Sequence, residues 1–98
     1  SASQGTTPES VQFLQLALSS KEIIILMLAR FSRVPHVYYA VVCRNTSAGT
    51  APAVNHLIEL PDVSETPPDL AHTLRLHVID YDCLVLVIQS RNSVVLIQ

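Results

Sequence analysis

Apolar residues recur at two different spacings along the chain, and these spacings predict its elements. Val11, Leu14 and Leu18 follow one another at intervals of three and four residues, as on one face of a helix. Pro8 stands directly before this pattern, at a position that suits the first turn of a helix. We therefore predict an amphipathic helix over residues 8–19.

The run over residues 22–29 is apolar on both parities, so periodicity alone leaves strand and helix open. Its three successive isoleucines favour a strand, whereas the Leu-Met-Leu-Ala that follows favours a helix. We interpret the run as a strand. Residues 37–43 are almost wholly β-branched, aromatic or small and predict a second strand, paired with the first as a hairpin.

The second half of the chain reads as strands separated by loops. In residues 53–60, apolar and polar residues alternate well enough to predict an edge strand. Residues 61–68 are acidic and contain prolines, so they predict a loop. In that loop, Asp62 and Glu65 are candidate contact residues. Three further apolar segments, at residues 74–78, 83–88 and 94–97, predict an antiparallel meander.

These elements predict an α+β fold: an N-terminal amphipathic helix packed on an antiparallel β-sheet of about five to six strands that ends in a meander. Residues 1–7 are expected to form a flexible tail and residues 8–98 a single globular domain, because 98 residues suit one domain. Residues 83–88 are apolar on both parities, which fits a central strand covered by the helix on one face and by other protein on the opposite face.

Charged residues make up only 14% of the chain, against about 25% in ordinary soluble domains. This shortage predicts apolar surface that is covered by a protein partner, a second copy or an apolar ligand. The six basic residues are scattered and the net charge is −2, so the sequence argues against nucleic acid as a partner. No apolar run approaches the roughly 20 residues of a membrane span, so no transmembrane segment is expected.

The polar cluster Asp80-Tyr81-Asp82 lies between two apolar runs. Two carboxylates at this spacing share one face of a strand and could form an acid–base pair, but aspartate also favours turns, and a turn is needed here. We interpret the triplet as a turn. His72 and His77 lack further ligands at metal-binding spacing, and no nucleophile or phosphate-binding motif is present. The sequence therefore predicts no catalytic residue, metal or cofactor, and no enzyme.

Two cysteines, Cys43 and Cys83, allow one disulfide at most, and two buried free thiols are the simpler interpretation. Asn45-Thr46-Ser47 matches the glycosylation sequon, which would imply secretion and favour the disulfide. The compartment stays open, with a preference for an intracellular location.

The stretch from Val78 to Asp82 is similar to the second short motif of lipocalins, a Thr-Asp-Tyr corner between two barrel strands. Asp80 and Tyr81 match the motif, Ile79 stands where threonine is usual, and the chain has no tryptophan for the first lipocalin motif. The resemblance implies a carrier of an apolar small molecule or lipid in a β-lined cavity. The strand–turn–strand ending also resembles the last strands of roadblock- or longin-type adaptor domains.

The leading hypothesis is a non-enzymatic protein–protein interaction or assembly-subunit domain, which uses an apolar sheet face or edge for self-association or docking. The lipid carrier is the alternative, and a small hydrolase that uses Asp80 or Asp82 with a histidine is a third. The candidate interaction residues lie in the most apolar strands: Ile23, Ile25, Met27, Tyr38, Tyr39, Leu84, Leu86 and Ile88.

Overall fold

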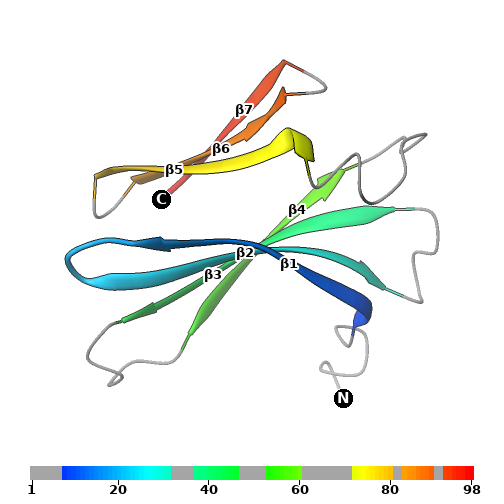
Figure 1. Ribbon diagram of the computed structural model, residues 1–98, viewed down its shortest axis with the longest axis horizontal. Coiled ribbons are helices and arrows are strands. Elements are labelled where there is room, and N and C mark those ends of the chain that lie inside the picture. The colour runs from blue at the N-terminus through cyan, green and yellow to red at the C-terminus, as the bar shows by residue number, and fades with distance from the viewer. Residues whose placement is uncertain (1–7, 32–36, 47–52, 61–71, 81–82, 90–91) are drawn as a thin grey trace.

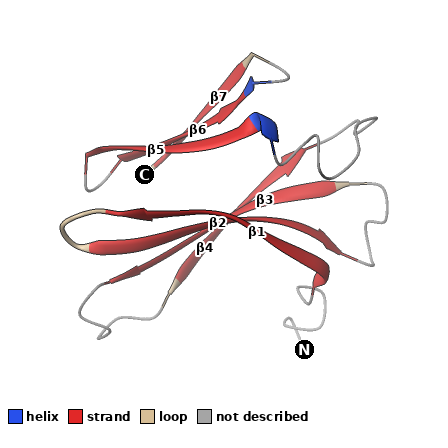
Figure 2. Ribbon diagram, in the orientation of Figure 1, coloured by secondary structure: helices blue, strands red, loops and turns tan. Residues whose placement is uncertain are grey.

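A computed structural model describes residues 8–31, 37–46, 53–60, 72–80, 83–89 and 92–98. Within these ranges the chain forms seven β-strands, with helical backbone confined to short turns at residues 72–73 and 89 (Figures 1 and 2). The strands are β1 (Pro8–Leu18), β2 (Glu22–Phe31), β3 (Tyr38–Thr46), β4 (Val54–Leu60), β5 (Leu74–Asp80), β6 (Cys83–Ile88) and β7 (Ser93–Ile97).

The strands form two antiparallel sheets that lie one over the other as two layers (Figure 1). Sheet A has the order β1-β2-β3-β4, and sheet B has the order β5-β6-β7. Strands that follow one another in the sequence are therefore neighbours in each sheet, so both sheets are meanders. The described part of the chain is an all-β sandwich.

The prediction of an α+β fold is wrong. The residues expected to form the N-terminal helix are β1, at one edge of sheet A. In place of a single sheet of about five to six strands, the described residues form two sheets with seven strands in all. Sheet A takes the place that the helix was expected to occupy, because it covers the inner face of sheet B. The predicted tail over residues 1–7 lies outside the described residues.

A bulge in β1 explains why this strand resembled a helix. Phe13 pairs with Met27 and Gln15 pairs with Leu26, so the register shifts at Leu14. Such a shift places one extra residue in the strand and breaks the period-two alternation of inward and outward side chains. The extra residue, Leu14, lies three positions after Val11 and four before Leu18, so these apolar residues follow the spacing of a helix.

The strand predictions for the rest of the chain are confirmed. The ambiguous run over residues 22–29 belongs to β2, which pairs with β3 as the expected hairpin. The strand predicted over residues 53–60 is β4 at an edge of sheet A, and the C-terminal meander is sheet B with β6 at its centre. Asp80 at the end of β5 pairs with Cys83 at the start of β6, so the chain reverses direction at the predicted turn. Residues 81–82 lie outside the described ones.

The core lies between the two sheets and consists of alternate residues of the strands, because side chains point to opposite faces in turn along a strand. Burying such a Leu, Ile or Val side chain is worth about 1.5–3 kcal/mol, so this layer holds the two sheets together. The buried residues of this layer are Ile24, Leu26, Leu28, Ala40, Val42 and Leu60 of sheet A, and Leu74, Leu76, Leu84, Leu86, Ile88 and Ile97 of sheet B. A second, smaller buried cluster on the opposite face of sheet A consists of Ala29, Phe31 and Val41.

Gln15 joins an edge of sheet A to an edge of sheet B. Its side-chain Nε2 donates a hydrogen bond to the carbonyl oxygen of Leu76 at 2.9 Å, and its Oε1 accepts one from the Leu76 N–H at 3.0 Å. Leu76 lies in β5, the edge strand of sheet B, where a backbone group can lack a neighbouring strand. The Gln15 amide therefore satisfies backbone groups of Leu76 as a paired strand would.

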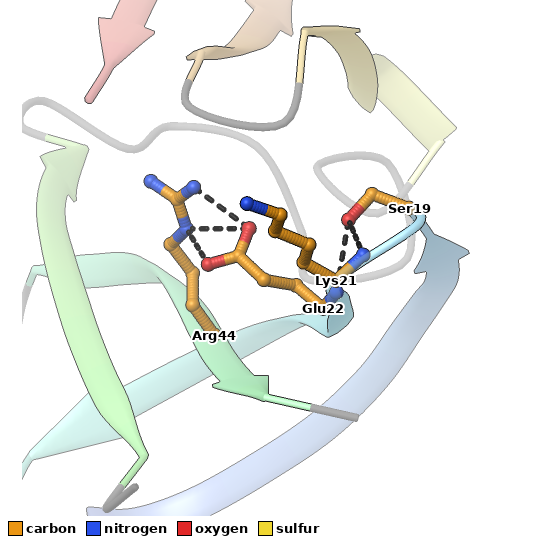
Figure 3. Close-up of polar contacts among 4 residues, drawn as sticks. All are labelled: Ser19, Lys21, Glu22 and Arg44. Atoms are coloured by element: carbon orange, nitrogen blue, oxygen red, sulfur yellow. Dashed lines mark hydrogen bonds and ion pairs between the residues drawn. The ribbon is translucent and has the colours of Figure 1, made fainter. Parts of the chain in front are cut away.

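A nearly buried ion pair joins β2 to β3 (Figure 3). Arg44 donates from Nη2 to Oε2 of Glu22 at 2.8 Å and from Nε to Oε1 at 3.1 Å, while the two side chains are 9% and 18% exposed. Beside it, the Ser19 hydroxyl accepts hydrogen bonds from the backbone N–H groups of Lys21 and Glu22 and so closes the β1–β2 turn. The turn thereby holds Glu22 where Arg44 can reach it.

Candidate functional site

The outer face of sheet A points away from sheet B and is mostly apolar. In β2 the buried core residues alternate with outward side chains, and cross-strand pairing carries the same face over the three other strands. This outer face of sheet A consists of Pro8, Val11, Phe13, Leu16 and Leu18 in β1; Ile23, Ile25, Met27, Ala29 and Phe31 in β2; Tyr39, Val41, Cys43 and Asn45 in β3; and Asn55, Leu57 and Glu59 in β4.

Large apolar side chains of this face are open to solvent at both of its edges. In β1, Phe13 is 61% exposed, Leu16 is 54% exposed and Leu18 is 68% exposed, while Leu57 in β4 is 51% exposed. An antiparallel sheet that faces water usually presents polar residues on that side. Contiguous exposed apolar residues instead mark surfaces that contact other molecules. The exposed apolar residues on these strands therefore form a candidate interaction surface.

The bulge in β1 decides which of its residues belong to this face. Before the bulge Phe13 lies opposite Met27, and after it Leu16 lies opposite Ile25. In a regular strand, residues three positions apart would point to opposite faces. Because Leu14 is inserted between them, both Phe13 and Leu16 point outward. The irregularity thus extends the apolar surface along the full length of β1.

A hollow of about 390 Å³ opens on the same face. Short side chains such as Ala29 lie there beside long ones, and Phe31 is held by an edge-to-face contact with Tyr39, with ring centroids 5.3 Å apart. The hollow can receive a protruding apolar side chain. Its lining residues are Pro8, Val11, Met27, Ala29, Phe31, Val41, Asn55 and Leu57.

The structure brings together part of the predicted set of interaction residues. Ile23, Ile25, Met27 and Tyr39 all lie on the outer face of sheet A. Tyr38 belongs to the same strand as Tyr39 but packs against the core between the sheets. The predicted contact residues Asp62 and Glu65 lie outside the described residues.

Leu84, Leu86 and Ile88 have a different role from the one expected of interaction residues. They are 0%, 0% and 5% exposed and pack in the core between the sheets. Both parities of β6 are apolar, but only the intervening residues, such as Val85, point outward. Leu84, Leu86 and Ile88 therefore hold the sandwich together and offer no surface to a partner.

The four outward apolar residues of β1, Val11, Phe13, Leu16 and Leu18, and Leu57 of β4 were not among the predicted interaction residues. The β1 residues were assigned to one stripe of a helix, which would have been buried against a sheet. The available signal was that a one-residue bulge at Leu14 restores a period-two alternation, with Val11, Phe13, Leu16 and Leu18 on one face and Gln12 and Gln15 on the other.

Both cysteine thiols are free and half-buried. Cys43 lies on the outer face of sheet A, whereas Cys83 begins β6 in sheet B. Asn45, the acceptor of the glycosylation sequon, is exposed near the end of β3. Ser47 of the sequon lies outside the described residues.

Charged and metal-binding groups are sparse on the described strands. Glu9 and Arg30 form an exposed ion pair at 3.1 Å, and this hydrogen bond raises the pKa of the Arg30 guanidinium above its ordinary value. No group of three or more His, Cys, Asp or Glu residues gathers into a metal site within the described ranges. In the same part of the chain, no helix is long and apolar enough to cross a membrane.

The outer face of sheet B is smaller and chemically mixed. It belongs to three strands of five to seven residues, whereas the strands of sheet A have seven to eleven. Val94 and Leu96 are 64% and 60% exposed there, but Arg75 and His77 share the same side. Sheet A therefore offers the larger and more uniformly apolar of the two outer faces.

No family model matches the chain, and neither a curated protein nor a solved structure is significantly similar to it.

Proposed function

We propose that the protein is a non-enzymatic interaction domain that docks to a protein partner through the outer face of sheet A. The observation that supports this best is the exposure of large apolar side chains on strands at both edges of that face, from Phe13 and Leu16 to Leu57. Removing apolar surface from water is worth about 25 cal/mol per Å². A partner that covers this face gains that free energy.

The filled interior supports docking over the alternative of an internal ligand carrier. Leu26, Val42, Leu84 and Leu86 are each 0% exposed, so side chains occupy the layer where a carrier would hold its ligand. The hollow lies on the outside of sheet A, where a side chain of a partner can enter it. Its apolar lining binds by excluding water, and the Asn55 amide at its border can orient a polar group of the partner.

Photo-cross-linking in a cell lysate tests the docking surface directly. A photoreactive phenylalanine derivative in place of Phe13 keeps the shape of an aromatic side chain on the outer face of sheet A. The same derivative in place of Leu96, which is similarly exposed on sheet B, is the control. We expect a discrete protein adduct, identified by mass spectrometry, from position 13 only. Equal labelling from both positions, or none from either, would contradict the proposal.

Native mass spectrometry tests the alternative. A lipid-sized mass that co-purifies with each chain would favour the carrier over the interaction domain. We expect instead a mass that corresponds to protein alone.

A further inference from the structure

We propose that the partner covering the outer face of sheet A is a second copy of this chain, packed face to face about a two-fold axis. This inference rests on the proposed function, because it names the partner of the same surface. It follows from three properties of that face: its area, its shape and its charge.

The area is that of a small but specific interface. Four strands about 4.8 Å apart and about 25–35 Å long give a face of roughly 500–600 Å². Two such faces together outline about 1,000–1,200 Å², but Ala29, Phe31 and Val41 at their centres are only 2%, 9% and 7% exposed, so the area buried between two copies lies near the roughly 1,000 Å² lower limit of a specific contact. The three short strands of sheet B give roughly 300 Å² by the same reasoning, which is too little for a stable dimer.

The shape of the face is self-complementary. β1 projects Phe13, Leu16 and Leu18 at one edge, and the hollow lies beside them on β2, β3 and β4. A two-fold axis brings each patch of one copy to a different patch of the other. The projecting side chains of each copy can then enter the hollow of its partner, and the two contacts form together.

The charges of the face also favour an identical partner. Among the residues that form it, Glu59 in the edge strand β4 is the charged one. Arg44, which lies in β3, is engaged by Glu22 on the inner side of the sheet. Apart from Glu59 at one edge, the described residues of the face therefore offer a charged partner no complementary charge. A second apolar face of the same kind avoids an unpaired buried charge.

Sedimentation equilibrium of the purified 98-residue chain tests the dimer, with Leu16→Asp and Leu96→Asp as matched variants. Both leucines are exposed on strands, by 54% and 60%, but they lie on opposite outer faces. We expect the unaltered chain and Leu96→Asp to show twice the 10.8 kDa chain mass at micromolar concentration. Leu16→Asp should raise the dimer dissociation constant by about 100-fold or more, because it buries an unpaired carboxylate.

A strict monomer in the unaltered chain would overturn the dimer, and so would equal weakening by both variants. Circular dichroism shows whether each variant is folded. Cross-linking of the pure protein from position 13 tests the same contact without an aspartate substitution: we expect a product of doubled mass, joined to residues that line the hollow.

The failure of this inference can be told apart from failure of the proposed function. If the pure chain is monomeric while position 13 cross-links to a different protein in a lysate, the dimer is wrong and the docking surface stands. If position 13 forms neither product, both are wrong.

Discussion

Two polar side chains make the contacts that bring β1, β2, β3 and β5 into a fixed arrangement. Gln15 pairs with the backbone of Leu76 across the two sheets, and Glu22 pairs with Arg44 within sheet A. Because only 14% of the residues are charged, single polar contacts of this kind carry much of the specificity of the packing. The sequence did not indicate either contact, since the partners are 61 and 22 positions apart.

Glu22→Gln tests the nearly buried ion pair. The substitution keeps the size of the side chain but leaves the Arg44 charge without its carboxylate. Unpairing a buried charge is strongly destabilising, so we expect a loss of about 3 kcal/mol in the free energy of unfolding, measured by urea denaturation. The matched control is Glu9→Gln, which breaks the exposed pair with Arg30 and should have a much smaller effect. A similar loss of unfolding free energy in both variants would show that the buried ion pair contributes no more to stability than the exposed one.

Gln15→Leu tests the connection between the sheet edges. It removes both hydrogen bonds to Leu76 and leaves that backbone unit without a partner, at an expected cost of about 1–3 kcal/mol. Amide hydrogen exchange at Leu76, followed by NMR, should become markedly faster. Gln12→Leu, at an exposed position of the same strand, is the control and should leave that exchange rate unchanged. Continued protection of the Leu76 amide in Gln15→Leu would contradict this role.

At the scale of the element, β1 shows how tertiary contacts override local preference. Glutamine, leucine, alanine and glutamate, which favour helices, dominate residues 8–18, and Val11 is the one β-branched residue in that range. The strand nevertheless forms, because β2 offers a ladder of backbone partners from Leu18 back to Pro8. The bulge at Leu14 then keeps Leu16 and Leu18 on the same outward face as Val11 and Phe13, while Leu14 and Ala17 pack against the core.

A synthetic peptide of residues 7–20 isolates this local preference. Without β2 as a partner, we expect it to become helical in trifluoroethanol, as measured by far-ultraviolet circular dichroism, while the intact protein shows a β spectrum. A peptide of residues 37–46, which is rich in β-branched and aromatic residues, is the control and should gain less helix. If the two peptides responded alike, local preference would not explain the error in the helix prediction.

At the scale of the whole molecule, stability comes from one apolar layer shared by both sheets. Neither sheet can bury its inner face alone, because the core alternates residues of sheet A with residues of sheet B. The two sheets should therefore unfold together in a single transition.

Leu86→Ala tests this shared layer. Leu86 is fully buried in β6, so its truncation leaves a cavity and should cost about 2–5 kcal/mol in urea denaturation. The matched control is Leu96→Ala in the neighbouring strand, whose side chain is 60% exposed and whose truncation should cost far less. Both must be compared at one protein concentration, because association adds to apparent stability. If probes in sheet B reported a lower free energy of unfolding while probes in sheet A did not, the two sheets would unfold separately.

The candidate site could be predicted only in part. Ile23, Ile25, Met27 and Tyr39 were identified from the apolar character of their strands, and all four lie on the outer face of sheet A. For β6 the same signal selected Leu84, Leu86 and Ile88, which are buried. When every residue of a strand is apolar, the sequence does not reveal which of its two alternating sets of side chains faces the core, since that depends on the sheet packed against it.

Local patterns were enough to predict the strands from residue 22 onward and their arrangement as a hairpin and a meander, because these features follow from alternation, β-branched residues and turns. The shortage of charge also predicted that apolar surface would remain. Three features depend on the folded arrangement: residues 8–18 form a strand, the strands divide into two sheets, and one set of alternate residues in each strand faces outward. These outcomes depend on contacts between residues far apart in the chain, such as Gln15 with Leu76, which no local pattern encodes.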